Sequence, residues 1–254
     1  VNRGNFSPPP HFALSLLMEG HTGVALFMTL SGYLFAKLLT DQNIIFTSFL
    51  WNRFLRLAPL LIFVFSIVGI RAYLAGVEPI VYAKLILWGL IKPWWPNGGW
   101  SITVEFQFYL ILPFLLFLSH KSKYFLLLFI VGVICFRVVL YLELGQIQSL
   151  AYYTIVGRID QFVLGILAYQ CRDLFRGRHV VALSIFLCFA AFYLYFDSLG
   201  GVYKNPRYPS PHPIWIYMTT VEGLAYASLI AWYDNSFNHT SGRFSRFVAL
   251  IGTY

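Results

Sequence analysis

The chain has 254 residues, of which 59% are hydrophobic and only 11% are charged, and its mean hydropathy is +0.69. A water-soluble domain carries about 25% charged residues. The composition therefore excludes a soluble enzyme, a disordered protein and a disulfide-rich secreted module, and it predicts a polytopic membrane protein. The net charge of +8 does not indicate nucleic-acid binding, because the basic residues lie in short clusters between apolar runs. The three cysteines lack any metal-ligand spacing, so no metal is expected.

Seven apolar runs are long enough to cross a bilayer core of about 30 Å as helices. A shorter run, 80–91, contains Lys84 and precedes Lys92-Pro93, so we interpret it as a re-entrant or interfacial segment. A further helix begins at Phe247 and is cut at the chain end. We therefore predict one integral membrane domain over residues 1–254, an all-α transmembrane helix bundle that is incomplete at both ends. The seven spans are 23–40, 57–74, 100–118, 124–142, 150–170, 180–196 and 214–233.

The connections between these runs differ in charge, which predicts their orientation. Positive loops lie on the cytoplasmic side of membrane proteins. Residue 1 then starts outside, so we expect an earlier helix before it. The outer segment 197–213 is rich in Pro and Gly and is interpreted as a surface lid. Ten cations share the predicted cytoplasmic side: Lys37, Arg53, Arg56, Lys121, Lys123, Arg172, Arg176, Arg178, Arg243 and Arg246.

Charged residues inside the runs are functional candidates, because a charge at a helix centre costs at least about 2.5–3.5 kcal/mol. Glu105 gives the clearest pattern. Ser101, Glu105 and Tyr109 follow i, i+4, i+8 spacing and share one helix face. We predict that this face borders a polar cavity, and the alternative is a buried structural carboxylate. Arg137 and Glu222 are equally consistent with structural ion pairs.

Two further pairs of charges are open to two interpretations each. Arg158 and Asp160 are two residues apart, so they point in different directions and each needs a partner on another helix or in a ligand. For Asp160 the candidates are Arg137 and the arginines of the 53–56 turn, and an interhelical ion pair is slightly favoured. Arg53 and Arg56 share one helix face at the cytoplasmic entry. They are suited to binding phosphates, although such residues also contact lipid headgroups.

Four blocks, in this order, resemble acyltransferase family 3, the membrane O-acyltransferases of bacterial surface polysaccharides. Each block is weak alone in an apolar sequence, but four in order are specific. The final Ile251-Gly252-Thr253-Tyr254 resembles the start of a late helix of the family. The four blocks are GVALFMTLSGYL (23–34), RFLRLAP (53–59), WSITVEFQFYLILP (100–113) and RIDQFVLG (158–165).

The resemblance implies transfer of an acyl group, commonly acetyl, from acyl-CoA to a hydroxyl of a carbohydrate or lipid-linked glycan in the bacterial inner (plasma) membrane. It implies no bound cofactor, because acyl-CoA is a substrate. Arg53 and Arg56 would bind the donor phosphates. Glu105 would support the catalytic base, while the acceptor pocket would be lined by Trp100, Ser101, Tyr109, Arg158 and Asp160.

The sequence lacks the residue pattern that carries the catalytic base in this family. The family's first helix carries an Arg followed after ten residues by a His, thought to be the base, and no Arg in this chain has a His eleven positions later. Arg3, the natural candidate, reaches Leu14. His11 and His21 are interpreted as loop histidines. We therefore expect that the first helix is missing, that Glu105 would orient its imidazole, and that the chain alone is inactive.

Two other function classes remain open from the sequence. A transporter of glycan or lipid precursors would use Glu105, Asp160 and Arg158 as a relay, although no internal repeat supports it. A non-catalytic scaffold would pair all its buried charges with one another.

Overall fold

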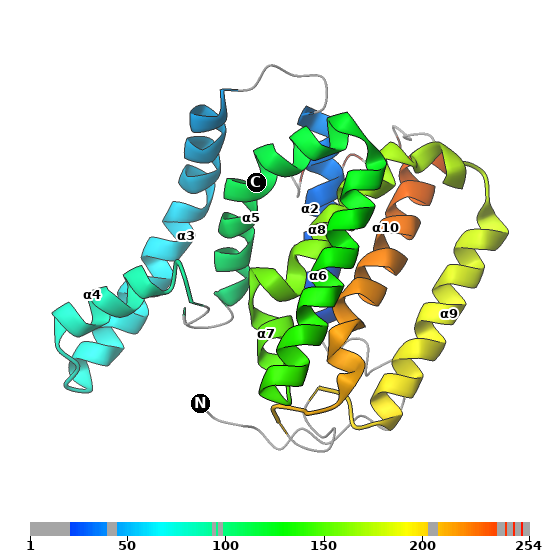
Figure 1. Ribbon diagram of the computed structural model, residues 1–254. Helices are drawn as coiled ribbons and strands as arrows, with labels where there is room; N and C mark the ends of the chain where they lie inside the picture. Colours follow the sequence, from blue (N-terminus) through cyan, green and yellow to red (C-terminus); the bar gives the residue numbers. More distant parts are fainter. Residues whose placement is uncertain are drawn as a thin grey trace.

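The computed structural model describes residues 21–39, 45–92, 95, 99–202 and 208–237, with residues 242, 246 and 250. These residues form helices and connections without a strand, which confirms the predicted all-α bundle (Figure 1). Two short 3-10 turns, η1 (Arg172–Phe175) and η2 (Pro213–Ile216), precede α9 and α10. The helices are α2 (His21–Leu39), α3 (Phe46–Leu74), α4 (Pro79–Trp88), α5 (Trp100–Lys121), α6 (Lys123–Leu144), α7 (Gln148–Tyr153), α8 (Ile155–Gln170), α9 (His179–Ser198) and α10 (Met218–Ser236).

Five of these helices, α2, α3, α5, α6 and α9, are long and apolar enough to cross a membrane. The predicted span 150–170 instead forms two helices, because the backbone is extended at Thr154 between α7 and α8. α8 and α10 carry buried polar side chains and lie inside the bundle. α4 has ten residues, about 15 Å, and is too short to cross, as predicted for 80–91. The helix predicted from Phe247 lies outside the described residues.

The centre of the bundle is α8, which packs against α2, α10, α5 and α6 (Figure 1). Two glycines allow α2 and α8 to touch backbone to backbone. A methyl group on Gly165 would lie 2.1 Å from the carbonyl oxygen of Thr29, and one on Gly32 would lie 2.0 Å from that of Phe162. Small residues permit such close approach of membrane helices. The glycines of two of the sequence blocks therefore set the α2–α8 packing.

Helix ends with basic residues meet at one end of the bundle, which we name the basic end. The last turns of α2 and α10 are joined there by Lys37 and Asp234, whose Nζ and Oδ1 atoms are 2.6 Å apart. The ends of α8 and α5 are joined by a hydrogen bond of 2.8 Å from Gln170 to the Ser119 carbonyl. Trp100 begins α5 at the opposite end, beside α7. The basic end is the one that the charge rule assigns to the cytoplasm.

α3 and α4 form a peripheral hairpin that stands apart from the rest of the bundle in Figure 1. Neither helix contains a buried residue. The Tyr82 hydroxyl ties the two helices together by donating to the Phe65 carbonyl at 2.7 Å. With 29 residues, α3 is about 44 Å long, and its apolar part, 57–74, is long enough to cross a bilayer core of about 30 Å, so the first turns with Arg53 and Arg56 can extend beyond the core. The described part of the chain therefore leaves most of the hairpin's surface uncovered.

Candidate functional site

The carboxylate of Glu105 points into the bundle and away from lipid. The residue is 8% exposed, and Tyr109, one turn further along α5, is 2% exposed and donates its hydroxyl proton to Oε1 of Glu105. Ser101, one turn earlier, is half-buried. Leu110, on another face of the helix, is 52% exposed. Among the described residues, no cation lies within ion-pair distance of Glu105, so its charge is not neutralised by a direct partner.

Arg53 reaches the Glu105–Tyr109 pair from α3. Its guanidinium carbon lies 4.7 Å from the ring centre of Phe35 and 5.7 Å from that of Phe49. Those two rings contact the ring of Tyr109 at 5.4 and 5.8 Å. The rings of Phe35 and Phe49 therefore link Arg53 to Tyr109, which bonds Glu105. Rings hold a guanidinium by its face and leave its N–H edge free for an anion.

Arg56 lies one turn after Arg53 on α3 and is exposed. Neither arginine makes a hydrogen bond or an ion pair with any residue that the structure describes. Two guanidiniums one turn apart, without protein acceptors in the described ranges, have the charge and the donors that a phosphate requires.

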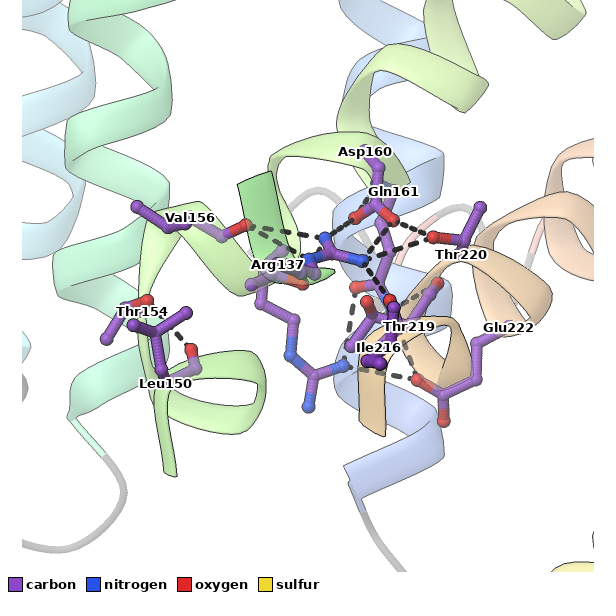
Figure 2. Close-up of polar contacts among 12 residues, drawn as sticks. Arg137, Leu150, Thr154, Val156, Asp160, Gln161, Ile216, Thr219, Thr220 and Glu222 are labelled. Atoms are coloured by element: carbon purple, nitrogen blue, oxygen red, sulfur yellow. Dashed lines mark hydrogen bonds and ion pairs between the residues drawn. The ribbon is translucent and has the colours of Figure 1, made fainter. Parts of the chain in front are cut away.

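A second group of charges is fully satisfied by the protein. Arg137 of α6 binds Asp160 of α8 through two contacts, Nη2–Oδ1 at 2.8 Å and Nη1–Oδ2 at 3.0 Å (Figure 2). Both side chains have no exposed surface. Arg137 also donates to the Gly157 carbonyl at 2.8 Å, and Asp160 accepts from the Thr220 hydroxyl. Arg137 was one of the partners considered for Asp160. Their pair joins α6, α8 and α10.

Arg158 is held less completely. It meets Glu222 through a single contact, Nη1–Oε2 at 3.2 Å, and its Nε donates to the Tyr152 carbonyl at 3.0 Å. Its guanidinium carbon lies 5.6 Å from the ring centre of Trp100 and 5.2 Å from that of Tyr152. Glu222 additionally accepts from Gln161 at 3.1 Å and from the Tyr193 hydroxyl. The bonds of Arg158 use Nε and Nη1 and leave Nη2 for another acceptor.

The predicted site residues thus lie in three places. Arg53, Tyr109 and Glu105 form one group with Arg56 nearby, Trp100 and Arg158 form another, and Asp160 belongs to the structural pair with Arg137. The sequence reasoning missed several partners in these groups. Gln161 follows Asp160 in the fourth block, and its polar side chain could have marked it as a candidate there. The tyrosines lie in apolar runs, where no sequence pattern distinguishes them from packing residues. The missed residues are Tyr152, Gln161, Tyr193 and Thr220.

The described histidine side chains do not reach Glu105. His120 contacts the Leu116 carbonyl at 2.6 Å, His179 accepts from Trp232 at 3.2 Å, and His212 accepts from the Ile214 amide at 3.1 Å. The side chain of His21 and the whole of His11 and His239 lie outside what the structure describes. In the described ranges, no cluster of His, Cys, Asp and Glu is suited to a metal ion.

The fold and its buried charges define a polytopic helical membrane protein. Comparison with protein families gives the family: residues 2–253 match the acyltransferase domain of acyltransferase family 3, and the chain belongs to that family. Curated proteins and solved structures give no match to this chain. The family and the apolar helices make it a membrane acyltransferase, which favours the enzyme over the transporter.

Proposed function

We propose that the chain moves an acyl group, acetyl in the simplest case, from acyl-CoA to a hydroxyl of a cell-surface carbohydrate or lipid-linked glycan. The donor arrives at the basic end, which faces the cytoplasm of a bacterial cell across its inner membrane. The observation that carries the proposal is the placement of Arg53 and Arg56. Arg53 packs on the two rings that contact Tyr109, Arg56 lies one turn further along α3, and neither has an acidic partner among the described residues.

The reaction assigns a task to each group. The acceptor oxygen attacks the thioester carbonyl, the carbon–sulfur bond breaks, and CoA leaves as its thiol. The hydroxyl proton passes to a base, because a sugar alcohol barely ionises at neutral pH, and the base returns it to the sulfur of CoA. The family resemblance assigns the base to an imidazole, and Glu105 orients that imidazole and stabilises its protonated form, with Tyr109 fixing the carboxylate. Arg53 and Arg56 bind the phosphates of CoA by charge-assisted hydrogen bonds.

Donor binding is tested by isothermal titration of CoA into the chain in lipid nanodiscs. A double variant, Arg53→Ala with Arg56→Ala, is expected to weaken CoA binding roughly 10- to 100-fold, because hydrogen bonds to charged groups are lost. Arg71→Ala is the matched control, since Arg71 is also exposed on α3 but lies in its last turn. Unchanged CoA affinity in the double variant would remove the donor site.

Transfer is tested with radiolabelled acetyl-CoA and membrane glycan. The assay supplies a helix that carries Arg and His eleven positions apart, because the described histidine side chains bond elsewhere and do not reach Glu105. We expect transfer in this assay. Glu105→Gln should lower its rate by about 10²-fold or more, the scale on which groups that assist proton transfer contribute. Rates close to the unmodified chain in Glu105→Gln and in both arginine variants would refute the assignment.

A further inference from the structure

A cluster of aromatic side chains surrounds Arg158 at the end of the bundle opposite the basic end. Tyr152 lies at its centre, with its ring 5.2 Å from that of Trp100, 4.5 Å from that of Tyr153 and 6.4 Å from that of Trp215. The rings come from α5, α7 and η2. We name this group the aromatic cluster: Trp100, Tyr152, Tyr153 and Trp215.

The cluster contains a buried polar donor without a hydrogen-bond partner, Nε1 of Trp215. The bonds of Arg158 to Tyr152, Gln161 and Glu222 use Nε and Nη1 and leave Nη2 for another acceptor. A buried polar group without a partner costs about 1–3 kcal/mol. By contrast, Arg137 uses both terminal nitrogens on protein acceptors. The unused donors therefore indicate a ligand with oxygen acceptors.

Described residues on both sides of 203–207 bond to α7, the helix that supplies Tyr152 and Tyr153 to this cluster. The amide of Gln148, a fully buried residue of α7, donates to the Val202 carbonyl at 2.6 Å and accepts from the Ser210 amide. The Tyr208 hydroxyl donates to that of Tyr153 at 3.2 Å. Tyr153 and Tyr208 are half-buried. The same short helix thus bonds Val202, Tyr208 and Ser210 and supplies two rings of the cluster.

We propose that the aromatic cluster with Arg158 is a subsite for a pyranose ring of the acceptor glycan. A pyranose has flat apolar faces of C–H groups and a rim of hydroxyls. Aromatic faces pack against the former, and a few fixed donors bind the latter. The subsite rests on the proposed function and places the acceptor. Trp100 and Glu105 are five residues apart on α5, about 7.5 Å along its axis. Gln148 acts as a positioning residue, because it holds Val202 and Ser210 beside α7.

The test is saturation-transfer difference NMR on the chain in nanodiscs. The probes are methyl glucopyranoside, methyl galactopyranoside and N-acetylglucosamine, and the control is sorbitol, which has the hydroxyls but no ring face. We expect transfer to the pyranosides and not to sorbitol. Tyr153→Ala should weaken binding of the responsive pyranoside roughly tenfold, whereas Tyr153→Phe should keep most of it. Tyr73→Ala removes an exposed ring from α3 and should have no effect.

Two further variants test the indole N–H of Trp215 and the side-chain contacts of Gln148. Trp215→Phe keeps a ring but removes the N–H group, and Gln148→Leu keeps the volume but releases Val202 and Ser210. Each should weaken pyranoside binding several-fold without changing CoA titration. Absence of pyranoside binding to the unmodified chain, equal binding of sorbitol, or full binding in Tyr153→Ala would overturn the subsite. CoA binding that persists in those cases leaves the donor half of the proposed function standing, so the two failures are distinguishable.

Discussion

The charged side chains of this protein lie in two contrasting regions, the central helices α8 and α10 and the peripheral α3–α4 hairpin. In the centre, Arg158 and Asp160 have no exposed surface, and each meets an opposite charge on another helix. In the hairpin no residue is buried, and Arg53 and Arg56 meet no acidic partner among the described residues. Paired charges in a low-dielectric interior hold helices together, whereas unpaired peripheral charges remain available to a ligand.

The largest effect is expected where the comparison is sharpest, at Asp160. Asp160→Asn leaves Arg137 fully buried without its counter-charge, and breaking such a pair costs about 3–5 kcal/mol of folding free energy. The measurement is thermal unfolding in detergent. Asp197→Asn on α9 is the matched control, because Asp197 is partly exposed and makes no ion pair in the described ranges. Equal melting temperatures for the two variants would contradict a structural role for the Arg137–Asp160 pair.

The next effect is expected at the contact of α2 with α8. Gly165→Ala places a methyl group 2.1 Å from the backbone oxygen of Thr29, so the helices must separate. Overpacking of this kind costs about 1–3 kcal/mol. Gly132→Ala on α6 is the control, since nothing lies within 4 Å of its added methyl group. Unfolding in increasing denaturant compares them, and a Gly165→Ala variant as stable as Gly132→Ala would show that α2 and α8 can move apart freely.

A substitution in the α3–α4 hairpin should change CoA affinity but hardly change the stability of the fold. Arg53→Lys keeps the positive charge but loses the planar donor fork and its stacking on Phe35 and Phe49. We expect CoA affinity to fall by about tenfold and the free energy of unfolding to change by less than about 0.5 kcal/mol. CoA titration and thermal unfolding are measured on the same sample, with Arg71→Lys as the control. A loss of stability as large as that of Asp160→Asn would place Arg53 among the structural charges.

The sequence predicted the parts of this arrangement that follow from helical periodicity. Spacing of 3.6 residues per turn places Ser101, Glu105 and Tyr109 on one face, and the structure turns Glu105 and Tyr109 inward. Length and charge alone predicted that 80–91 is too short to cross, and the ten residues of α4 confirm that length; its re-entrant or interfacial placement stays a prediction. The cost of an unpaired buried charge also predicted that Asp160 needs a cation, with Arg137 as one candidate.

Other features depend on packing between distant segments, so hydropathy did not reveal them. The break at Thr154 divides an apolar run whose composition continues on both sides. Glu222 lies 64 residues from Arg158, and no local pattern links the two. Tyr193 contributes its hydroxyl to Glu222 from an apolar helix, where a tyrosine is ordinarily a packing residue. Tertiary contacts alone distinguish these residues from their neighbours.

The smallest effect is expected at the ion pair of the basic end. Lys37 contacts Asp234 at 2.6 Å, but the two side chains are 39% and 21% exposed. Solvent and salt screen such a pair, so Lys37→Met should cost at most about 1 kcal/mol, and the difference from the unmodified chain should shrink at high salt. The Tyr33 hydroxyl continues to donate to Asp234 at 2.8 Å, so the carboxylate keeps a partner. Thermal unfolding at low and high ionic strength measures the loss of stability and its dependence on salt. A loss of stability in Lys37→Met that does not depend on salt and approaches that of Asp160→Asn would contradict this prediction. A half-exposed cation would then contribute as much to stability as a buried one, and exposure would not distinguish the structural charges of this bundle.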